Sequence, residues 1–301
     1  MAFIVLLGAG ASHGSEHVDP HLPPLGNKLF HALAEYDGVA ASLPKYLRDK
    51  FTLNFENGMA EFYEYAHGDI MGFQRELARY LANFSPCEGN IYIELIKALK
   101  SQRVIYSSLN YDLLFELSVV KLGLEYSYDS TFREGCVRIL KIHGSSNFWP
   151  DIPTGTLKGC KVFMSDRADI QASIRSLDQI ETLKKCRLED SVAPAMAMFA
   201  VGKAVKISPD FVEDQYLLWK EQVKKTSKVF IIGVGVHEVD EHIWGVLGSS
   251  KAQIHYFGFP SDREKFDCWQ LKYPKLKAFF HNSDFKKSIQ TIKKLSEKNR
   301  V

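Results

Sequence analysis

Residues 4–14 read IVLLGAGASHG, an apolar run that leads directly into two closely spaced glycines. A buried strand followed by Gly-x-Gly is how the dinucleotide-binding fingerprint G-x-G-x-x-G begins. Gly8 and Gly10 fit its first two positions, but the third position holds His13 and the next glycine is Gly14. The fingerprint also needs a second strand ending in an acidic residue about twenty positions later, and no strand-like run follows there. The stretch favours an α/β sheet and weakens the hypothesis of a hydride-transfer dehydrogenase.

The residues around these glycines are small. Ala9, Ala11 and Ser12 leave the backbone amides after Leu7 free to face a phosphate, with the Ser12 hydroxyl as an extra donor. A strand-to-helix turn that needs only small residues explains the same sequence. For this loop alone both interpretations stay open, because a single Gly-x-Gly is a weak signal.

The composition is that of an ordinary soluble globular protein. The chain has 301 residues, enough for one large domain or two modest ones. Its 38 Lys and Arg residues nearly balance its 36 Asp and Glu residues, which leaves a net charge of +2. A net charge this small does not indicate nucleic acid as a partner.

The cysteine pattern and the apolar N-terminal run bear on metal binding and location. The five cysteines are scattered without a C-x-x-C pair, which excludes the usual zinc spacing, so we expect no bound metal. An odd, scattered set favours reduced thiols in the cytoplasm. Residues 3–7 are too short a run for a membrane span and lack the flanks of a signal peptide. We therefore expect a soluble cytoplasmic protein with no membrane partner.

Short apolar runs recur along the chain, separated by stretches with helical periodicity. The predicted strands are residues 3–7, 103–109, 137–143, 192–200, 228–234, 253–259 and 276–281. Alternation of this kind predicts an α/β fold with a Rossmann-like, doubly wound parallel sheet.

Two regions interrupt this alternation. Residues from about 35 to 100 contain several segments with helical spacing and no strand-like run, so we predict a helical insertion there. Residues from about 144 to 190 contain Pro150, Pro153 and several glycines, followed by a charged helical stretch over 165–187. We predict a mobile lobe in this second region. Both would belong to a single domain that covers residues 1–301.

Polar side chains follow two of the predicted strands. The sequence SSLNYD places Asn110 and Asp112 at a strand's carboxyl end, where open α/β sheets bind ligands. The alternative for Asp112 is a helix N-cap, which leaves Asn110 unexplained. His143 ends the next strand and precedes Gly144, a position from which a neutral imidazole can act as a general base. A lone histidine is more often a surface residue or a satisfied core residue.

A second glycine pair follows the strand over residues 228–234. Gly233 and Gly235 come after an apolar run and before a predicted helix, which allows another close backbone approach at the sheet edge. Asp240 is a candidate for binding a ribose hydroxyl, but the helix that follows favours a capping role for it.

Taken together, these motifs resemble the ordered motif set of the sirtuin superfamily. They are GAGAS (8–12), LNYD (109–112), HG (143–144) and IIGVGVHEVDEHI (231–243), and they span most of the chain. The resemblance is greater to the divergent zinc-less branch found in many bacterial antiphage defence proteins. It implies a Rossmann-like fold without a zinc module, and NAD+ as a substrate.

The resemblance also implies roles for individual residues. The loop that holds the NAD+ pyrophosphate would be Gly8, Ala9, Gly10 and Ser12. Asn110 and Asp112 would contact the ribose and pocket on the nicotinamide side, and His143 would be the catalytic histidine. Gly233 and Gly235 would lie on the adenosine side.

The chain departs from the family pattern at several positions. Leu109 stands where the family has glutamine, and Val234 replaces a serine or threonine. The four-cysteine zinc module is missing. The Ile-Pro-Asp-Phe-Arg run after the first glycines is replaced by HVDPHLPPLG (17–26), which leaves Asp19 as a weak candidate for holding the nicotinamide carboxamide.

The family's chemistry begins by breaking the bond between nicotinamide and ribose. We expect Asn110 to orient the ribose and a water, and His143 to accept a proton from that water or from a ribose hydroxyl. Because no acyl-lysine tunnel can be identified, water is the favoured nucleophile, and the resemblance implies NAD+ hydrolysis to nicotinamide and ADP-ribose in antiphage defence. The alternatives are an NAD-dependent protein deacylase or ADP-ribosyltransferase, and a non-catalytic module that senses NAD+ or ADP-ribose.

No appended sensing domain follows the last predicted helix. We therefore expect that activity is controlled by assembly into a homo-oligomer or by a separate activating protein, such as an ATPase or a phage component.

Overall fold

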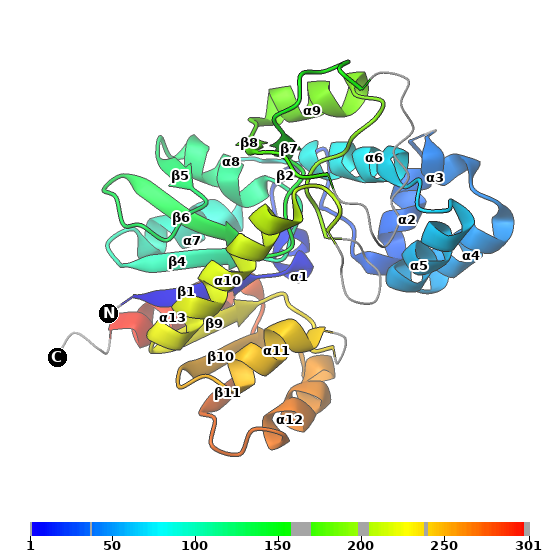
Figure 1. Ribbon diagram of the computed structural model, residues 1–301. Helices are drawn as coiled ribbons and strands as arrows, with labels where there is room; N and C mark the ends of the chain where they lie inside the picture. The colour runs from blue at the N-terminus through cyan, green and yellow to red at the C-terminus, as the bar shows by residue number, and fades with distance from the viewer. Residues whose placement is uncertain (1, 37, 158–169, 198–204, 238–239, 298–301) are drawn as a thin grey trace.

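A computed structural model describes residues 2–36, 38–157, 170–197, 205–237 and 240–297. Its centre is a seven-stranded sheet with the order β11-β10-β9-β1-β4-β6-β5, and its neighbouring strands are parallel (Figure 1). The strands are β1 (Phe3–Leu7), β4 (Val104–Ser108), β5 (Glu125–Ser127), β6 (Cys136–Lys141), β9 (Lys228–Ile232), β10 (Gln253–Gly258) and β11 (Ala278–Asn282). The chain places three strands on one side of β1 and then three on the other, so the predicted doubly wound α/β fold is confirmed.

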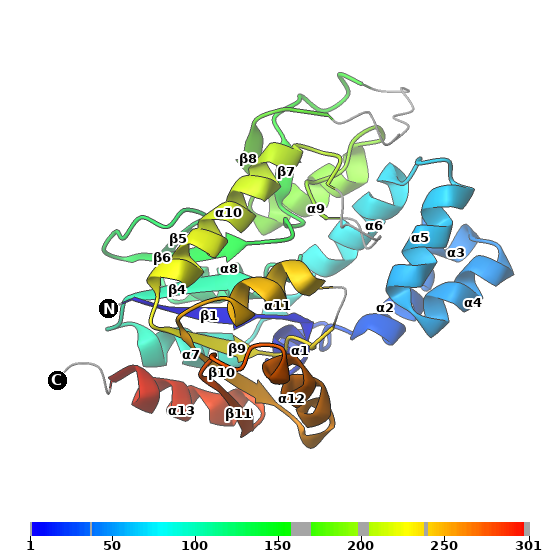
Figure 2. The same cartoon turned by 60° about the horizontal axis from the view of Figure 1, so that its bottom comes forward.

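Helices cover both faces of the sheet, as uninterrupted apolar parallel strands require. In β1, Ile4 and Leu6 belong to one buried cluster, while Val5 and Leu7 belong to the other, because successive side chains of a strand point to opposite faces. The first face carries α10 (Pro209–Lys225), α11 (Glu241–Gly248) and α12 (Arg263–Leu271), and the second carries α7 (Ile91–Leu99), α8 (Leu114–Lys121) and α13 (Phe285–Glu297) (Figure 2). The short 3-10 helix η2 (Pro260–Asp262) directly precedes α12. Because helices cover both faces of the central strands, ligands are expected to contact these strands at their ends.

One predicted strand is absent, and one strand of the sheet was not predicted. Residues 192–197 form no strand, and Met196 makes only an isolated antiparallel bridge with Gly144. Residues 198–200 of that prediction lie outside the described part. A short apolar run does not by itself distinguish a strand from a buried extended segment. The edge strand β5 has only three residues, none of them fully buried, so it has no apolar run to reveal it.

Between β1 and β4 the chain forms a helical body beside the sheet (Figure 1). After the short α1 (Ala9–His13) come α2 (Gly26–Ala34), α3 (Val39–Ser42), α4 (Lys45–Leu53), α5 (Phe55–Tyr65) and α6 (Met71–Ala82), flanked by the paired strands β2 (Val18–Asp19) and β3 (Ser85–Pro86). The buried ring of Phe51 is central to this body, stacked against Phe30 at 4.4 Å and Phe73 at 5.5 Å between ring centroids. Helices therefore fill the region of the predicted insertion, except that α7 at its end belongs to the layers of the sheet.

In its described residues, the region predicted as a mobile lobe contains one antiparallel pair of short strands and one helix. β7 (Phe148–Pro150) and β8 (Ile174–Ser176) pair antiparallel, and α9 (Gln179–Leu188) follows them. The helix predicted over 165–187 begins at Gln179, because Asp178 is its N-cap and accepts a hydrogen bond from the Glu181 amide at 2.8 Å. Residues 158–169 lie outside the described part, and the mobility of the lobe stays a prediction.

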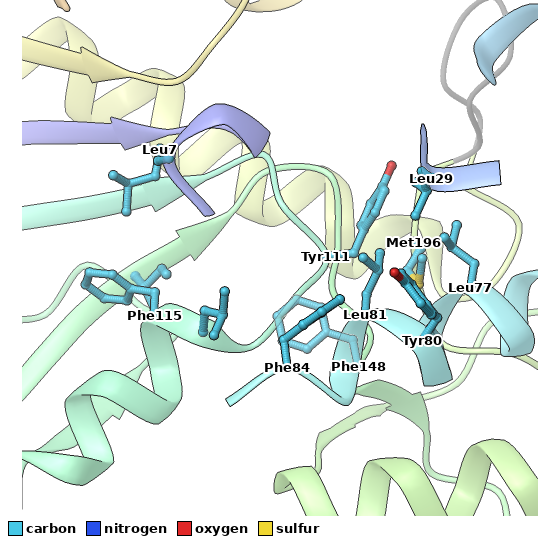
Figure 3. Close-up of a cluster of buried hydrophobic side chains, with 14 of the residues drawn as sticks. Leu7, Leu29, Leu77, Tyr80, Leu81, Phe84, Tyr111, Phe115, Phe148 and Met196 are labelled. Atoms are coloured by element: carbon cyan, nitrogen blue, oxygen red, sulfur yellow. The ribbon is translucent and has the colours of Figure 1, made fainter. Parts of the chain in front are cut away.

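A cluster of apolar side chains joins the sheet, the helical body and this lobe. Figure 3 shows Leu77 and Leu81 of α6, Phe148 of β7 and Met196 gathered near Tyr111, which follows β4. The Tyr111 hydroxyl also donates a hydrogen bond to a backbone carbonyl of the segment that contains Met196, at 2.9 Å. The turn after β4 is thereby fixed by all three parts of the fold.

Candidate functional site

The candidate site lies at the carboxyl ends of β1, β4, β6 and β9. The chain leaves β1 for β4 on one side and later returns to place β9 on the other, so the strand order reverses between β1 and β9. Open α/β sheets bind ligands at such a switch point, outside the carboxyl ends of the strands. The predicted residues Gly8, Asn110, His143 and Gly233 each follow one of these four strands.

Gly8 and Gly233 bring the two glycine loops into backbone contact. A Cβ atom on Gly8 would lie 2.4 Å from the Gly233 carbonyl oxygen, and one on Gly233 would lie 2.0 Å from the Ala11 amide nitrogen. Gly233 also has a φ of +65°, a conformation that favours glycine. The first role of these glycines is therefore to let one loop pack directly on the other.

The amides of the first glycine loop are largely bonded to the protein itself. Gly8 and Gly10 donate to carbonyl oxygens at and just after the end of β9, at 3.0 and 2.9 Å, and Ala11 donates to the Gly8 carbonyl at 2.9 Å. The expectation that the amides after Leu7 are free to face a phosphate is wrong for these three. Ala9, at the start of α1, is exposed. Binding of NAD+ by this loop stays a prediction.

Ser12, Asn110 and Asp112 form one buried hydrogen-bond network. Asn110 Nδ2 donates to the Gly8 carbonyl and to Ser12 Oγ, both at 2.9 Å. Ser12 Oγ donates to Asp112 Oδ2 at 2.8 Å and lies 2.9 Å from the Tyr92 hydroxyl. Because the single Ser12 proton goes to Asp112, Tyr92 is the donor in the second contact. Residues predicted from two separate motifs are therefore in direct contact.

This network changes the interpretation of Ser12. Its oxygen accepts from Asn110 and Tyr92, and its proton is given to Asp112, so the extra donor expected for a phosphate is already used. Burial, reinforced by the Asp112 charge, holds the pKa of Tyr92 well above its usual range, so this hydroxyl remains a donor. Ser12 therefore acts in this arrangement by holding Asn110 and Asp112 in place.

Asp112 lies one residue before the N-cap of α8, which is Leu113, and its contact with a ligand stays a prediction. Its Oδ1 accepts a hydrogen bond from the Leu114 amide at the start of α8, at 3.1 Å, while Oδ2 belongs to the network. Lys141, at the end of β6, donates from Nζ to the Asp112 carbonyl at 2.7 Å and lies 3.1 Å from Glu116 Oε1. Both members of this ion pair are almost completely buried, which makes the pairing necessary for each. The turn that carries Asn110 is therefore held by the hydrogen-bond network of Ser12 and by the contact of Lys141 with the Asp112 carbonyl.

His143 is hydrogen-bonded to a second histidine, His242, in the first turn of α11. Their Nε2 atoms lie 2.8 Å apart, and His143 is 7% exposed. One Nε2 must carry a proton and the other must accept it, because two imidazolium rings would turn two N–H groups toward each other. The strands before these histidines, β6 and β9, are separated in the sheet by β1 and β4, so the pair reaches across the strands of the switch point. The two imidazole rings therefore share one proton between their Nε2 atoms.

The turn that carries His143 is held by the segment 192–197. The Ala197 amide donates to the His143 carbonyl at 2.8 Å, and the Ser145 amide donates to the Ala195 carbonyl at 3.1 Å. Gly144 has a φ of +81°, and a Cβ there would lie 2.2 Å from the Ala195 carbonyl oxygen. A glycine after the histidine is therefore required by the close passage of this segment.

The second glycine motif leads into α11. The Gly235 carbonyl accepts a hydrogen bond from Trp244 Nε1 at 3.1 Å, which ties the loop to its helix. Asp240 occupies the N-cap position of α11, but its side chain makes no capping hydrogen bond, so the favoured capping role is wrong in this respect. Its charge contributes, after burial and Glu56, to raising the pKa of Tyr111, which follows β4. Binding of cofactor by Gly233, Gly235 and Asp240 stays a prediction.

Three residues of the site were missed at the level of sequence. Tyr92 lies on α7, eighty positions from Ser12, and has no local signal. His242 lies inside the motif IIGVGVHEVDEHI and was open to detection as a histidine in the first turn of the helix after a switch-point strand. Lys141 is a charged residue within an apolar strand, which is itself a sign of a buried partner. Asp19, by contrast, lies exposed on β2.

Two kinds of feature are not found within the described ranges. In that part of the chain no group of three or more His, Cys, Asp or Glu side chains is arranged to hold a metal ion. Likewise, none of its helices combines the length and the apolar character needed to cross a bilayer.

No protein-family model matches the sequence, and no curated protein matches it. Among solved structures, the chain is similar to a Sir2 homologue in complex with NAD, with 12% identity, 99% of this chain and 90% of that chain covered, and a TM-score of 0.44. It is also similar to a Sir2 with a p53 peptide and NAD+, at 11% identity, 99% and 94% coverage and a TM-score of 0.48. A third is a Sir2 with the inhibitor EX-527, 2′-O-acetyl-ADP-ribose and deacetylated p53 peptide, at 12% identity, 98% and 94% coverage and a TM-score of 0.48. At these identities and TM-scores the likeness concerns the course of the backbone and does not extend to activity.

Proposed function

We propose that this protein is an NAD+ glycohydrolase, which cleaves NAD+ to nicotinamide and ADP-ribose. The observation that carries the proposal is the convergence of an amide, a carboxylate and a histidine pair at the switch point. Asn110 and Asp112 belong to one hydrogen-bond network. Tyr111, which stands between them in the sequence, donates to the Ala197 carbonyl, and the Ala197 amide donates to the His143 carbonyl. An oriented amide and a proton acceptor, each after the carboxyl end of one of two neighbouring strands, suit a reaction at the anomeric carbon of a ribose.

In the proposed reaction the bond from the anomeric carbon to the nicotinamide nitrogen breaks, and its electron pair stays with nicotinamide. The leaving group becomes neutral as it departs, so positioning and electrostatics contribute more than acid catalysis. The Asp112 carboxylate is proposed to stabilise the positive charge that develops on the ribose. Water then forms the new bond to the anomeric carbon and loses one proton.

The histidine pair is proposed to receive that proton. His143 Nε2 is bonded to His242 Nε2, so His143 accepts a proton either at Nδ1, while its Nε2 proton passes to His242, or at Nε2 after the two rings separate. In both cases the pair must begin with only one proton between the two Nε2 atoms. His242 is thus proposed as the relay partner of His143.

The first test measures nicotinamide release by chromatography for the wild type, His143→Gln and Asn110→Ala. We expect each substitution to reduce turnover by at least ~100-fold, because a positioned acid-base group contributes ~10²–10⁴-fold. His143→Gln retains a hydrogen-bonding side chain but no base. His67→Asn is the matched control, since His67 is exposed at the end of α5 and asparagine tolerates its positive φ.

Full turnover in both site variants, with melting temperatures equal to that of the wild type, would contradict the hydrolase. NAD+ that binds without release of nicotinamide, with any activating partner present, would instead favour a sensing module. Transfer of an acyl group or ADP-ribose to or from peptides, followed by mass spectrometry, would favour a deacylase or transferase.

The role in antiphage defence rests on the resemblance of the motifs, and so does control by self-assembly or an activating protein. We propose NAD+ depletion as the defensive effect and test the assembly by gel filtration with light scattering, with and without NAD+. A protein that remains monomeric in both conditions would leave the separate activating protein as the proposed control.

A further inference from the structure

A cavity lies at the opposite end of the sheet from the candidate site. It has a volume of about 470 Å³ and opens between the end of α7, the start of β4 and the loop that leads into β6. The strands run parallel, so the amino ends of β4 and β6 are a full strand length from Asn110 and His143. A volume of this size falls within the range of ~300–1,000 Å³ usual for small-molecule pockets.

The wall of the cavity is apolar on the side of the core. Ile96 and Leu99 from α7, Val104 and Tyr106 from β4, and Leu124 supply it. Tyr106 is buried and its hydroxyl stays protonated, because burial raises its pKa. The body of a fitting ligand is therefore apolar.

A buried guanidinium, that of Arg138, lines the same cavity. Arg138 is 3% exposed, its Nη2 donates to the Val104 carbonyl, and its Nη1 is buried without a hydrogen-bond partner. The ring of Phe132 lies against the guanidinium on one side, and Arg103 lies over the same ring at 4.2 Å. A buried cation with an unused donor is costly unless something accepts from it.

The charges around Arg138 do not supply that acceptor. Burial, and then the positive charge of Arg103, lower the pKa of Arg138 to about 10, so it remains charged at neutral pH. Asp129 is the nearby carboxylate, but it is bonded to Arg133 at 2.6 Å and to the Thr131 amide at 2.7 Å. The cavity lining therefore has an excess of positive charge, with Lys100, Arg133 and Arg138 against the carboxylate of Glu134.

We propose that this cavity is a binding site for a small carboxylate with an aromatic or branched aliphatic body. The carboxylate accepts from Arg138 Nη1, and the body lies against Ile96, Leu99 and Leu124. Phe132 is 37% exposed and belongs to a loop without regular structure, so a rotation of its side chain opens the guanidinium to the ligand. This site is separate from the proposed NAD+ site and does not depend on it.

The test is calorimetric titration of the full chain with 3-phenylpropionate, its neutral amide 3-phenylpropionamide, and acetate. We expect saturable binding of the acid, with the amide and acetate at least ~10-fold weaker, because one lacks the charge and the other the apolar body. Arg138→Met removes the guanidinium while filling most of its volume. We expect this variant to bind the acid as weakly as the wild type binds the amide. Arg263→Met is the matched control, since Arg263 is exposed, paired with Asp267 and not part of the cavity lining, and we expect a change within ~3-fold.

A second variant keeps the test decisive if Arg138→Met does not fold. Leu124→Trp fills the cavity from its apolar wall and keeps the charge of Arg138, and we expect it to abolish binding of the acid. Equal binding of acid and amide, unchanged binding in both Arg138→Met and Leu124→Trp, or no saturation at millimolar concentration would overturn the proposal. Displacement of the acid by NAD+ would also overturn it, because the two sites lie at opposite ends of the sheet.

Discussion

Gly233 and Gly123 separate two reasons for which a glycine is needed. Their φ values are nearly the same, at +65° and +67°, so both occupy the left-handed region. A Cβ on Gly123 would meet nothing within 4 Å, whereas one on Gly233 would lie 2.0 Å from the Ala11 amide nitrogen. Backbone strain therefore acts at both positions, and a steric clash between two loops acts only at Gly233.

We predict that Gly123→Ala lowers the free energy of unfolding by about 1 kcal/mol and Gly233→Ala by at least about 3 kcal/mol. The larger loss follows because the loop after β9 must move away from the loop after β1. Urea denaturation of the two variants measures the difference. Equal losses would show that contact between the glycine loops contributes nothing beyond backbone conformation.

At the scale of elements, the strands were predictable because their apolar runs reflect burial on both faces. The strand over residues 3–7 was exact in its bounds, and five others were correct to within a few residues. β5 was not predictable, since its three residues carry no apolar run. The segment 192–197 misled because its apolar residues pack beneath the His143 turn instead of joining the sheet.

Residues of the candidate site, like the strands, were predictable where the local sequence carries a signal for them. Asn110 and His143 were found because a polar residue after a buried strand stands out from its neighbours. Tyr92 was not, because its contact with Ser12 comes from the packing of α7 on the sheet. The hydrogen bonds from the Gly8 and Gly10 amides to carbonyl groups at the end of β9 could not be predicted either, because they depend on how closely the two loops approach.

The strands β9, β10 and β11 carry a stack of rings centred on His255. Its ring lies 5.2 Å from Phe230 and 4.9 Å from Phe279 between centroids, and its Nδ1 lies 3.0 Å from His281 Nε2. Burial, and then the charges of His281 and Lys228, lower the pKa of His255 to about 4. The ring is therefore held neutral within the sheet at neutral pH.

The folded-state pKa of His255 lies below its unfolded value of about 6.5, so the unfolded chain takes up the proton first. Its contribution to stability is complete above about pH 6.5 and is lost as the pH falls toward 4. We predict a loss of about 2 kcal/mol in the free energy of unfolding between about pH 7 and pH 5 from this residue. His255→Phe fits the stack without titrating, and should flatten the curve of stability against pH over that interval. An unchanged slope in this variant would assign the acid sensitivity to other groups.

At the scale of the whole molecule, the candidate site is attached to the helical body through the segment 190–197. Gln74 of α6 donates from Nε2 to the Pro194 carbonyl at 2.9 Å, and Arg75 donates to the Val192 carbonyl at 3.0 Å. The far end of the segment bonds the His143 carbonyl through the Ala197 amide, at 2.8 Å. A change in the helical body is therefore expected to reach the histidine pair through this segment.

Hydrogen exchange of the Ala197 amide measures that connection without any assumption about activity. We predict that Gln74→Leu increases its exchange rate by about 5-fold or more, because the loss of a buried hydrogen bond costs about 1 kcal/mol or more locally. Amides of β1, in the centre of the sheet, should keep their protection. Gln270→Leu is the matched control, since Gln270 bonds the Ala278 carbonyl at the far side of the sheet and should leave Ala197 unchanged. If Ala197 exchanges at the wild-type rate in Gln74→Leu, the His143 turn is held by the sheet and by Tyr111 alone, and the helical body has no hold on the site.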